Sequence, residues 1–288
     1  MEHWAVELVS DARAHLGEGP LWDDRTGELL WVDILAGIVH RLDPSTGRDR
    51  TFDAGQPVGA VVQRAAGGYA LAVRDGFAVS DGVETRVVAP VESDLREQRM
   101  NDGACDSRGR LWAGTMELAE VRPVGAVYRL GPVGEVETML TGVTVSNGIA
   151  WSPDDTLLYY VDSPTCGVDV FDFDAATGAI SGRRRLVTIA DGDGFPDGLV
   201  VDAEGCLWVA LWDGWAVHRY APDGELLGVV DVPVGRVTKP AFGGPELTDL
   251  FITTAAPDEP DPAQPAAGGV FRARPGVRGL APHPYRGL

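Results

Sequence analysis

One structural unit of about 40 to 50 residues occurs six times along this chain of 288 residues. A polar turn such as DDRTGE, SPDD or DAEG separates two strand-like segments in each copy, and two further segments follow in most of them. Short apolar runs bounded by Gly, Asp and Pro are strand signals. Four strands in each of six units predict an all-β fold, a six-bladed β-propeller.

Two β-sandwich domains are the alternative, but they would not require six matched units. No Pro/Ser-rich linker divides the chain, so we predict a single propeller domain over residues 1–288. The apolar segment WAVELV near the start could complete the last blade and close the ring. The Pro-rich stretch at 256–269 is interpreted as a surface loop within that blade.

Composition excludes several classes of partner. A formal net charge of -19 opposes binding to nucleic acid or to an anionic membrane, since phosphate would be repelled. The three cysteines lack CxxC spacing, and no apolar run resembles a signal core or a membrane span. We therefore expect a soluble, cytoplasmic protein with reduced cysteines. No feature indicates an oligomeric state.

The repeat predicts a ring of side chains around the propeller axis, because innermost strands line the central channel. The aligned starts of the copies are Glu18, Val58, Asp102, Asn147, Asp197 and Pro240. Four of these six carry side-chain oxygens, which suit a hard divalent cation, and the absence of His and Cys disfavours structural zinc. Asp or Asn before Gly is also a common turn residue. Glu18 is not explained in this way, because Glu is not a turn former, and a carboxylate buried near the axis without a partner would be costly.

Two carboxylates and an amide around a cation would leave coordination positions open for water and substrate. Such a site suits hydrolysis of an ester or lactone, with a carboxylate as general base. The chain has neither a GxSxG elbow nor an HExxH motif, so a Ser-His-Asp hydrolase has no support. Arg99 could contact a polyol, and Trp212 and Trp215 could line the channel mouth; Trp31, Trp112 and Trp208 suit the blade core.

Five stretches carry a resemblance to a known family: LGEGPLWD, RMNDGACDSRGRLWAGTM, SNGIAWSPDDTLLYYVDS, PDGLVVDAEGCLWVALW and KPAFGG. In this order and spacing they resemble the gluconolactonase/regucalcin family, also called the senescence marker protein and luciferin-regenerating enzyme family. The similarity extends from about residue 14 to 279. The resemblance implies a six-bladed propeller with one divalent metal ion in its channel.

Residue by residue, the resemblance implies that Glu18, Asn147 and Asp197 are the metal ligands and that Asp197 is also the catalytic base. It implies substrate contacts from Arg99 and Asn101, and so favours Asn101 over the ring-aligned Asp102. A family Glu after GTM falls between Glu117 and Glu120, and neither is assigned.

The implied reaction is hydrolysis of a sugar (aldono-) lactone to the aldonic acid. Ca²⁺ is favoured by the all-oxygen ligands, while Zn²⁺, Mn²⁺, Mg²⁺ and Fe²⁺ also occur in the family. Two rival interpretations stay open: a metal-dependent esterase or organophosphatase-type propeller, and a non-catalytic metal-binding propeller. The sequence does not select the lactone, the metal or the pathway.

Overall fold

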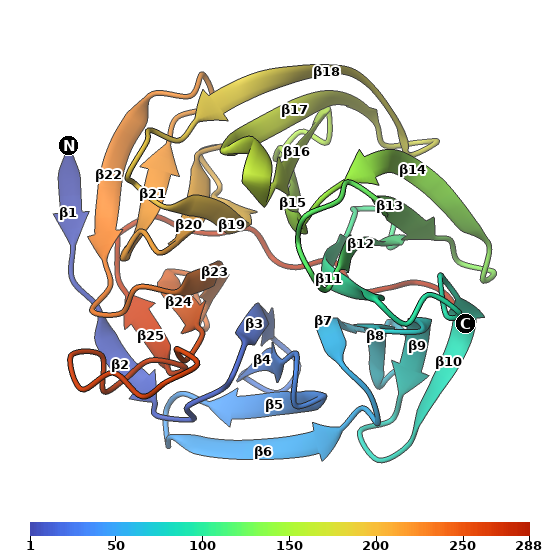
Figure 1. The fold of residues 1–288 in the computed structure, drawn as a ribbon, viewed down its shortest axis with the longest axis horizontal. Helices are drawn as coiled ribbons and strands as arrows, with labels where there is room; N and C mark the ends of the chain where they lie inside the picture. Colours follow the sequence, from blue (N-terminus) through green and yellow to red (C-terminus); the bar gives the residue numbers. More distant parts are fainter.

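The computed structural model describes residues 1–288 as 25 strands and one short 3₁₀ helix, η1 (Ser163–Thr165). The strands form six sheets arranged like blades around a common centre (Figure 1). The prediction of an all-β, six-bladed propeller is confirmed. No helix in the structure is long and apolar enough to cross a membrane.

Within each blade the first strand is innermost and later strands lie progressively further out, each antiparallel to the one before. Blade 1 contains β3 (Gly17–Asp23), β4 (Glu28–Asp33), β5 (Ile38–Asp43) and β6 (Arg48–Asp53), and blade 2 contains β7 (Val58–Gln63), β8 (Tyr69–Val73), β9 (Gly76–Ser80) and β10 (Thr85–Pro90). Blade 3 contains β11 (Gln98–Cys105), β12 (Leu111–Glu117), β13 (Gly125–Leu130) and β14 (Val136–Val143), and blade 4 contains β15 (Ser146–Trp151), β16 (Leu157–Asp162), β17 (Gly167–Asp174) and β18 (Ala179–Thr188). Blade 5 contains β19 (Phe195–Val201), β20 (Leu207–Trp212), β21 (Ala216–Tyr220) and β22 (Leu226–Asp231), and blade 6 contains β23 (Val237–Gly243), β24 (Asp249–Thr254) and β25 (Val270–Ala273).

The N-terminal segment closes the ring. Strand β2 (Glu7–Ser10) pairs antiparallel with β25 and supplies the fourth strand of blade 6, as the sequence predicted. Strand β1 (Glu2–Trp4) adds a fifth strand to blade 5 by pairing parallel with β22. The Pro-rich stretch at 256–269 lies between β24 and β25, inside the last blade.

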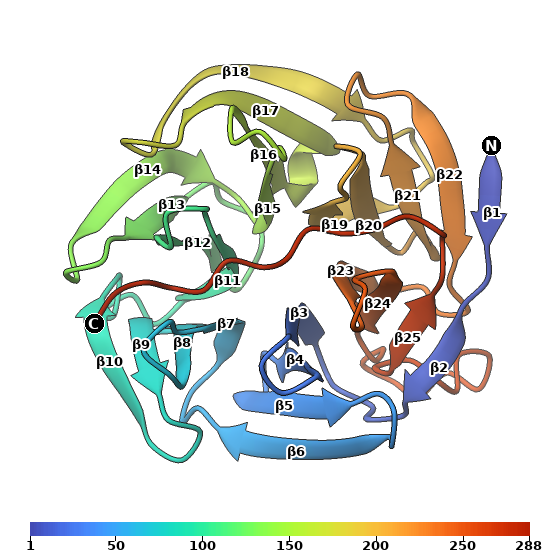
Figure 2. The ribbon, with the colours of Figure 1, turned by 180° about the vertical axis from the view of Figure 1, so that it is seen from behind.

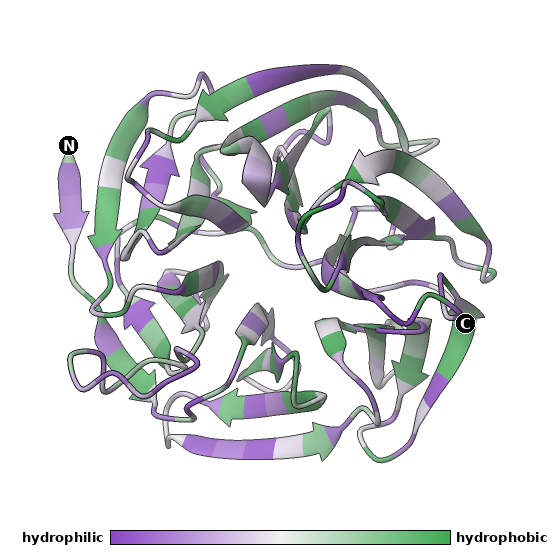
Figure 3. Cartoon of the chain, in the orientation of Figure 1, coloured by the Kyte–Doolittle hydropathy of each residue, from purple (hydrophilic) through white to green (hydrophobic).

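The core is divided into six hydrophobic clusters, one between each pair of neighbouring blades. Between blades 3 and 4, for example, Trp112 packs edge-on against Trp151 and Phe173. Trp31, Trp112 and Trp208 are fully buried, which confirms the prediction that they belong to the blade core. Outer strands are more polar; Figure 3 shows that β6 is mostly hydrophilic, and most of its residues are exposed.

Two of the polar turns are held by a buried Asp that binds a core Trp. In blade 3 the Asp106 carboxylate accepts hydrogen bonds from Trp112 Nε1 at 2.9 Å and from the Arg110 backbone amide at 3.1 Å. In blade 5 Asp202 accepts from Trp208 Nε1 at 3.0 Å and from the Cys206 amide at 2.9 Å. The DSRGRLW and DAEGCLW stretches therefore specify the turn and the core contact together.

The last residues of the chain form a strap across the rear face of the ring (Figure 2). This C-terminal strap, residues 276–288, is bonded to blade 5 through Ala203 N–H to Arg278 O at 2.8 Å. It reaches blade 2 through Tyr285 N–H to Gln63 O at 2.8 Å and blade 3 through Arg286 N–H to Gly109 O at 2.9 Å. The strap thus links opposite sides of the propeller.

Tyr285 is the main side-chain anchor of the strap. It is fully buried in the cluster between blades 2 and 3, and its hydroxyl donates to Gly131 O at 2.9 Å. Tyr285→Ala is expected to lower the free energy of unfolding by about 3 kcal/mol, as for other buried aromatic truncations. Denaturant unfolding measures this loss. Leu280→Ala, at a partly exposed position of the same strap, is the control and should cost less than about 1 kcal/mol; equal losses would contradict the anchor role.

Candidate active site

The candidate site is built from a bulge that recurs in the innermost strands. The pairing of β15 with β16 shifts register between Ser146 and Ile149, and that of β19 with β20 shifts between Pro196 and Leu199. Asn147 and Asp197 each lie in one of these bulges, where residues are released from the ladder. Glu18 lies at the start of the corresponding shift in β3.

The register corrects two positions of the aligned ring. In β11 the shift between Met100 and Gly103 encloses both Asn101 and Asp102, so Asn101, not Asp102, corresponds to Asn147. In β23 the shift lies between Val237 and Lys239, which places Thr238 rather than Pro240 on the ring. The residue after the ring position is Gly148 in β15 and Gly198 in β19, but it is Asp102 in β11 and Lys239 in β23, so an alignment that uses Gly as its marker shifts at these two places.

Side chains from four blades line one cavity of about 270 Å³ in the centre of the ring. It is called the front cavity because it opens on the face opposite the strap. The cavity contains all the predicted site residues: Glu18, Arg99, Asn101, Asn147 and Asp197. All five are almost fully buried.

Hydrogen bonds fix the orientation of the Asn147 amide. Ser163, in η1, donates its hydroxyl to Pro196 O at 2.6 Å, so its oxygen accepts from Asn147 Nδ2 at 2.8 Å. On the other side, Asn147 Oδ1 accepts from Asn101 Nδ2 at 3.0 Å. The amide oxygen of Asn147 has a second lone pair for a cation, while its nitrogen is held away.

Arg99 and Asn101 support this arrangement. The guanidinium of Arg99 can only donate, and its Nη1 binds Asn101 Oδ1 at 2.5 Å, which turns the Asn101 amide nitrogen toward Asn147. Burial lowers the pKa of Arg99 to about 10, although the charges on Glu120, Glu18 and Asp197 oppose this. Its Nε atom is buried without a partner. Sequence reasoning predicted these two residues as substrate contacts and missed their role in orienting Asn147.

Two carboxylates of the front cavity, Glu18 and Asp197, lack a full set of hydrogen-bond partners. Glu18 accepts a hydrogen bond from the Gly19 amide at 2.6 Å. Burial, and then the charge on Asp102, raise the pKa of Glu18 to about 8. Burial, and then the charges on Glu18 and Asp102, raise the pKa of Asp197 well above its ordinary value. Buried like charges of this kind fit a divalent cation, and the donor set of carboxylate and amide oxygens suits a hard one.

The front cavity distinguishes the residues that the sequence left open. Glu120, in a left-handed turn with φ 58°, lines it together with Trp212 and Asp213. Glu117 is not among the lining residues and instead pairs with Arg122. Trp215 is also absent from the lining and is partly exposed. Asp213 was not predicted, because nothing in the WDGW turn separates it from an ordinary turn residue.

A second group of possible metal-binding atoms lies at Asp202, Glu204 and Cys206, in the turn of blade 5. The guanidinium of Arg219 already occupies it, with Nη2 2.8 Å from Asp202 Oδ2 and 2.5 Å from Glu204 Oε2. Burial also raises the pKa of the Cys206 thiol. We therefore interpret this group as a structural turn.

Fold and site together define a six-bladed β-propeller with an acidic, oxygen-lined cavity at its centre. The model of the SMP-30/gluconolactonase/LRE-like region matches residues 16–256, and the chain belongs to this family.

Regucalcin of Xenopus laevis is 37% identical over 295 residues, covering 98% of both chains. Among solved structures, a luciferin-regenerating enzyme has a TM-score of 0.91 at 32% identity, with 99% of this chain and 100% of that chain covered. A calcium-binding protein, regucalcin, from Agrobacterium tumefaciens has a TM-score of 0.94 at 30% identity, with 99% of both chains covered.

Proposed function

We propose that the protein is a metal-dependent lactonase that hydrolyses a sugar lactone to its aldonic acid. The observation that carries the proposal is the convergence of Glu18, Asn147 and Asp197, from three different blades, in the front cavity. Membership of a family that includes gluconolactonases supports the substrate class. The regucalcin from Agrobacterium tumefaciens, a calcium-binding protein, supports Ca²⁺ as the first cation to test, and Mn²⁺, Mg²⁺, Zn²⁺ and Fe²⁺ also suit the donors.

In the proposed mechanism Glu18, Asn147 and Asp197 hold one divalent cation, which supplies Lewis acidity when bound. Asp197 takes a proton from the attacking water through its carboxylate. The water oxygen bonds to the lactone carbonyl carbon and the ring C–O bond breaks. The ring oxygen leaves as a hydroxyl after accepting the proton that Asp197 took from the water, which returns Asp197 to its carboxylate form. Arg99 and Asn101, with Glu120, hold substrate hydroxyls. Trp212, which also lines the cavity, limits the access of bulk water.

The test uses a panel of glucono-, galactono-, xylono- and arabinonolactones in a pH-indicator assay, with spontaneous hydrolysis subtracted. Protein treated with chelator is expected to fall to the background rate, and added divalent cation to restore hydrolysis of at least one lactone. No hydrolysis of any lactone with any cation would contradict the proposal. An aryl ester and an organophosphate in the same panel test the esterase alternative.

Glu120 and Glu117 form a matched pair for testing substrate contact. Because Glu120 lines the front cavity, Glu120→Gln is expected to lower kcat/KM by about tenfold or more, mainly through KM. Glu117→Gln, at a carboxylate outside the cavity, should leave kcat/KM within about twofold. The opposite ranking of the two variants in steady-state kinetics would remove Glu120 from the proposed site.

We also propose that the protein works in a reducing, cytoplasmic compartment. Its three cysteines are free, and two of them are buried.

A further inference from the structure

Lys239 is the only lysine in the sequence, while every other basic side chain, apart from the histidines, is Arg. A lysine normally lies at the surface. Here the side chain is 7% exposed and lies at the centre of the ring, in β23 of blade 6. Its position is therefore unusual for a residue without a partner or a function.

The partner of Lys239 is Asp102, on β11 across the ring. The ammonium group donates to Asp102 Oδ1, which also accepts from the Gly103 amide at 2.6 Å. Asp102 Oδ2 is buried with no hydrogen-bond partner, and the residue is 1% exposed. Lys239 is thus the only side chain that pairs with this carboxylate.

The pair lies one residue beyond the ring of proposed ligands. Asp102 follows Asn101 and Lys239 follows Thr238, whereas Gly19, Gly148 and Gly198 follow the three ligands. A side chain at Gly198 would collide with that of Lys239, so glycine there leaves room for the lysine. At the positions that directly follow the ring, the structure therefore leaves space for one ion pair, that of Lys239 with Asp102.

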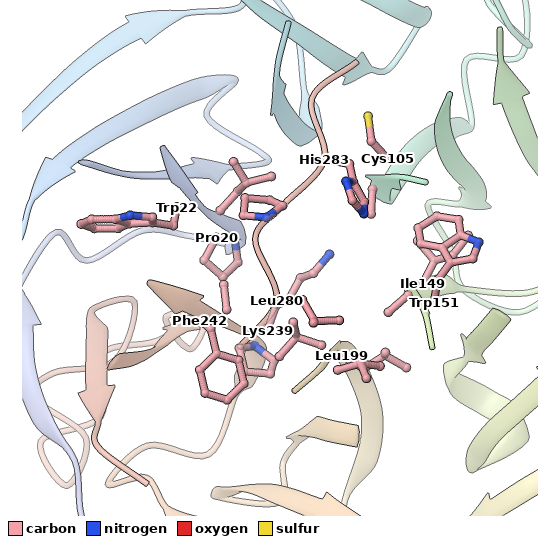
Figure 4. A pocket seen from close by; sticks show the side chains of 18 of the residues that line it. Pro20, Trp22, Cys105, Ile149, Trp151, Leu199, Lys239, Phe242, Leu280 and His283 are labelled. Carbon is pink, nitrogen blue, oxygen red and sulfur yellow. The ribbon is translucent and has the colours of Figure 1, made fainter. Parts of the chain in front are cut away.

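Lys239 also lies between two cavities at the centre of the ring. It lines a rear cavity of about 390 Å³ with mainly apolar residues, among them Leu199 and Phe242 (Figure 4). The strap covers that cavity through Leu280 to His283. Lys239 lines only the rear cavity, and Asp102 lines neither cavity but directly follows Asn101 of the front cavity, so the pair lies on the rear side of the front cavity and is called the floor.

The charges of Lys239 and Asp102 act on the proposed ligands in the front cavity. Lys239 and Asp102 both lie within electrostatic reach of Glu18 and Asp197, with opposite effects. Without the ammonium group, Arg99 would be left to compensate the charges of four carboxylates near the centre: Glu18, Asp102, Glu120 and Asp197. Interactions between charges in such buried places are weakly screened.

We propose that Lys239 is a positioning residue that neutralises Asp102 beneath the ligands and thereby limits the affinity of the site for divalent cations. The inference rests on the proposed function, because it takes Glu18, Asn147 and Asp197 as the ligands. The ammonium group is a permanent positive charge beside the carboxylates of the site. It repels a bound cation, and it stabilises the fold when no cation is bound.

The test is a double-mutant cycle on the full chain, with Ca²⁺ and Mn²⁺ affinities measured by calorimetry at one pH. Lys239→Met is expected to bind the cation about tenfold more tightly, and Asp102→Asn about tenfold more weakly. The double variant Lys239→Met/Asp102→Asn should return to within about threefold of the unsubstituted protein. Unchanged or weaker binding by Lys239→Met would overturn the proposal.

A second measurement needs no substitution at Lys239. With lysine labelled at Cε by ¹³C, the protein gives a single lysine resonance, which is expected to shift on saturation with Ca²⁺. The Glu18→Gln variant, which removes a proposed ligand, should show no shift at the same Ca²⁺ concentration. An unshifted resonance in a protein that calorimetry shows to be saturated would overturn the inference. Absence of any cation binding by the unsubstituted protein would instead contradict the proposed function.

Discussion

Asp197→Asn is expected to lower kcat for lactone hydrolysis by about a thousandfold, because an amide cannot accept the proton of the attacking water. The substitution keeps an oxygen that can bind a cation, so the variant should still bind Ca²⁺, although more weakly. Asp197 is buried in the front cavity, and burial raises the pKa of its carboxyl well above the ordinary value. A raised pKa suits a general base.

Kinetics at saturating cation, together with the metal content of the protein, separate the two roles of Asp197. The control is Asp193→Asn, an exposed carboxylate shortly before β19, which should retain the original rate. A variant with cation bound and the original rate of hydrolysis would rule out Asp197 as the base. Loss of both binding and hydrolysis at every cation concentration would reduce its role to that of a ligand.

Glu18→Gln is expected to weaken cation binding by about a hundredfold or more and to abolish hydrolysis at ordinary cation concentrations. In the absence of cation the same variant should be more stable at neutral pH, by about 1 to 3 kcal/mol, because the raised pKa of Glu18 means that its carboxyl group must take up a proton when the chain folds, whereas an amide need not. The site thus lowers the stability of the cation-free protein, and binding of the cation restores it.

Denaturant unfolding with chelator measures the expected gain in stability of the cation-free variant, and unfolding at saturating Ca²⁺ measures the expected loss of stabilisation by the cation. Glu28→Gln is a suitable control, because Glu28 is a buried carboxylate that pairs with Arg41 and Arg50 in blade 1. It should lose stability with or without cation and keep its affinity for the cation. Glu18→Gln that binds Ca²⁺ as the original protein does would contradict the ligand assignment.

The fold could be predicted almost completely from the sequence, because the repeat determines the number of blades and the order of strands within each blade. Every blade uses the same order of strand, polar turn and strand, and a matched repeat leaves few alternative architectures. The closure by the N-terminal segment was also predicted, from the extra apolar stretch WAVELV, and in the structure β2 supplies the strand that blade 6 otherwise lacks. The path of the strap was not predicted, because its bonds to blades 2, 3 and 5 use irregular backbone without a periodic pattern.

The candidate site could be predicted only in part. Oxygen-bearing residues at the aligned positions included Glu18, Asn147 and Asp197, which the family resemblance selected as ligands and which lie in one cavity. The repeat alone did not separate Asn101 from Asp102, because Asp102 occupies the position at which the copies in β15 and β19 have Gly148 and Gly198. The pairing of Lys239 with Asp102 joins residues that are 137 positions apart, so only the three-dimensional fold reveals it.

The closure of the ring has a consequence for biosynthesis. In the pairing of β2 with β25, Glu7 lies opposite Arg272. Strand β2 is among the first segments to be synthesised and β25 among the last, so blade 6 can be completed only at the end of synthesis. Until then β2 has no partner and β25 is missing, which leaves strand edges open to other chains. Such long-range pairing slows folding, and a nascent chain interrupted before residue 270 carries an unfinished ring that invites aggregation.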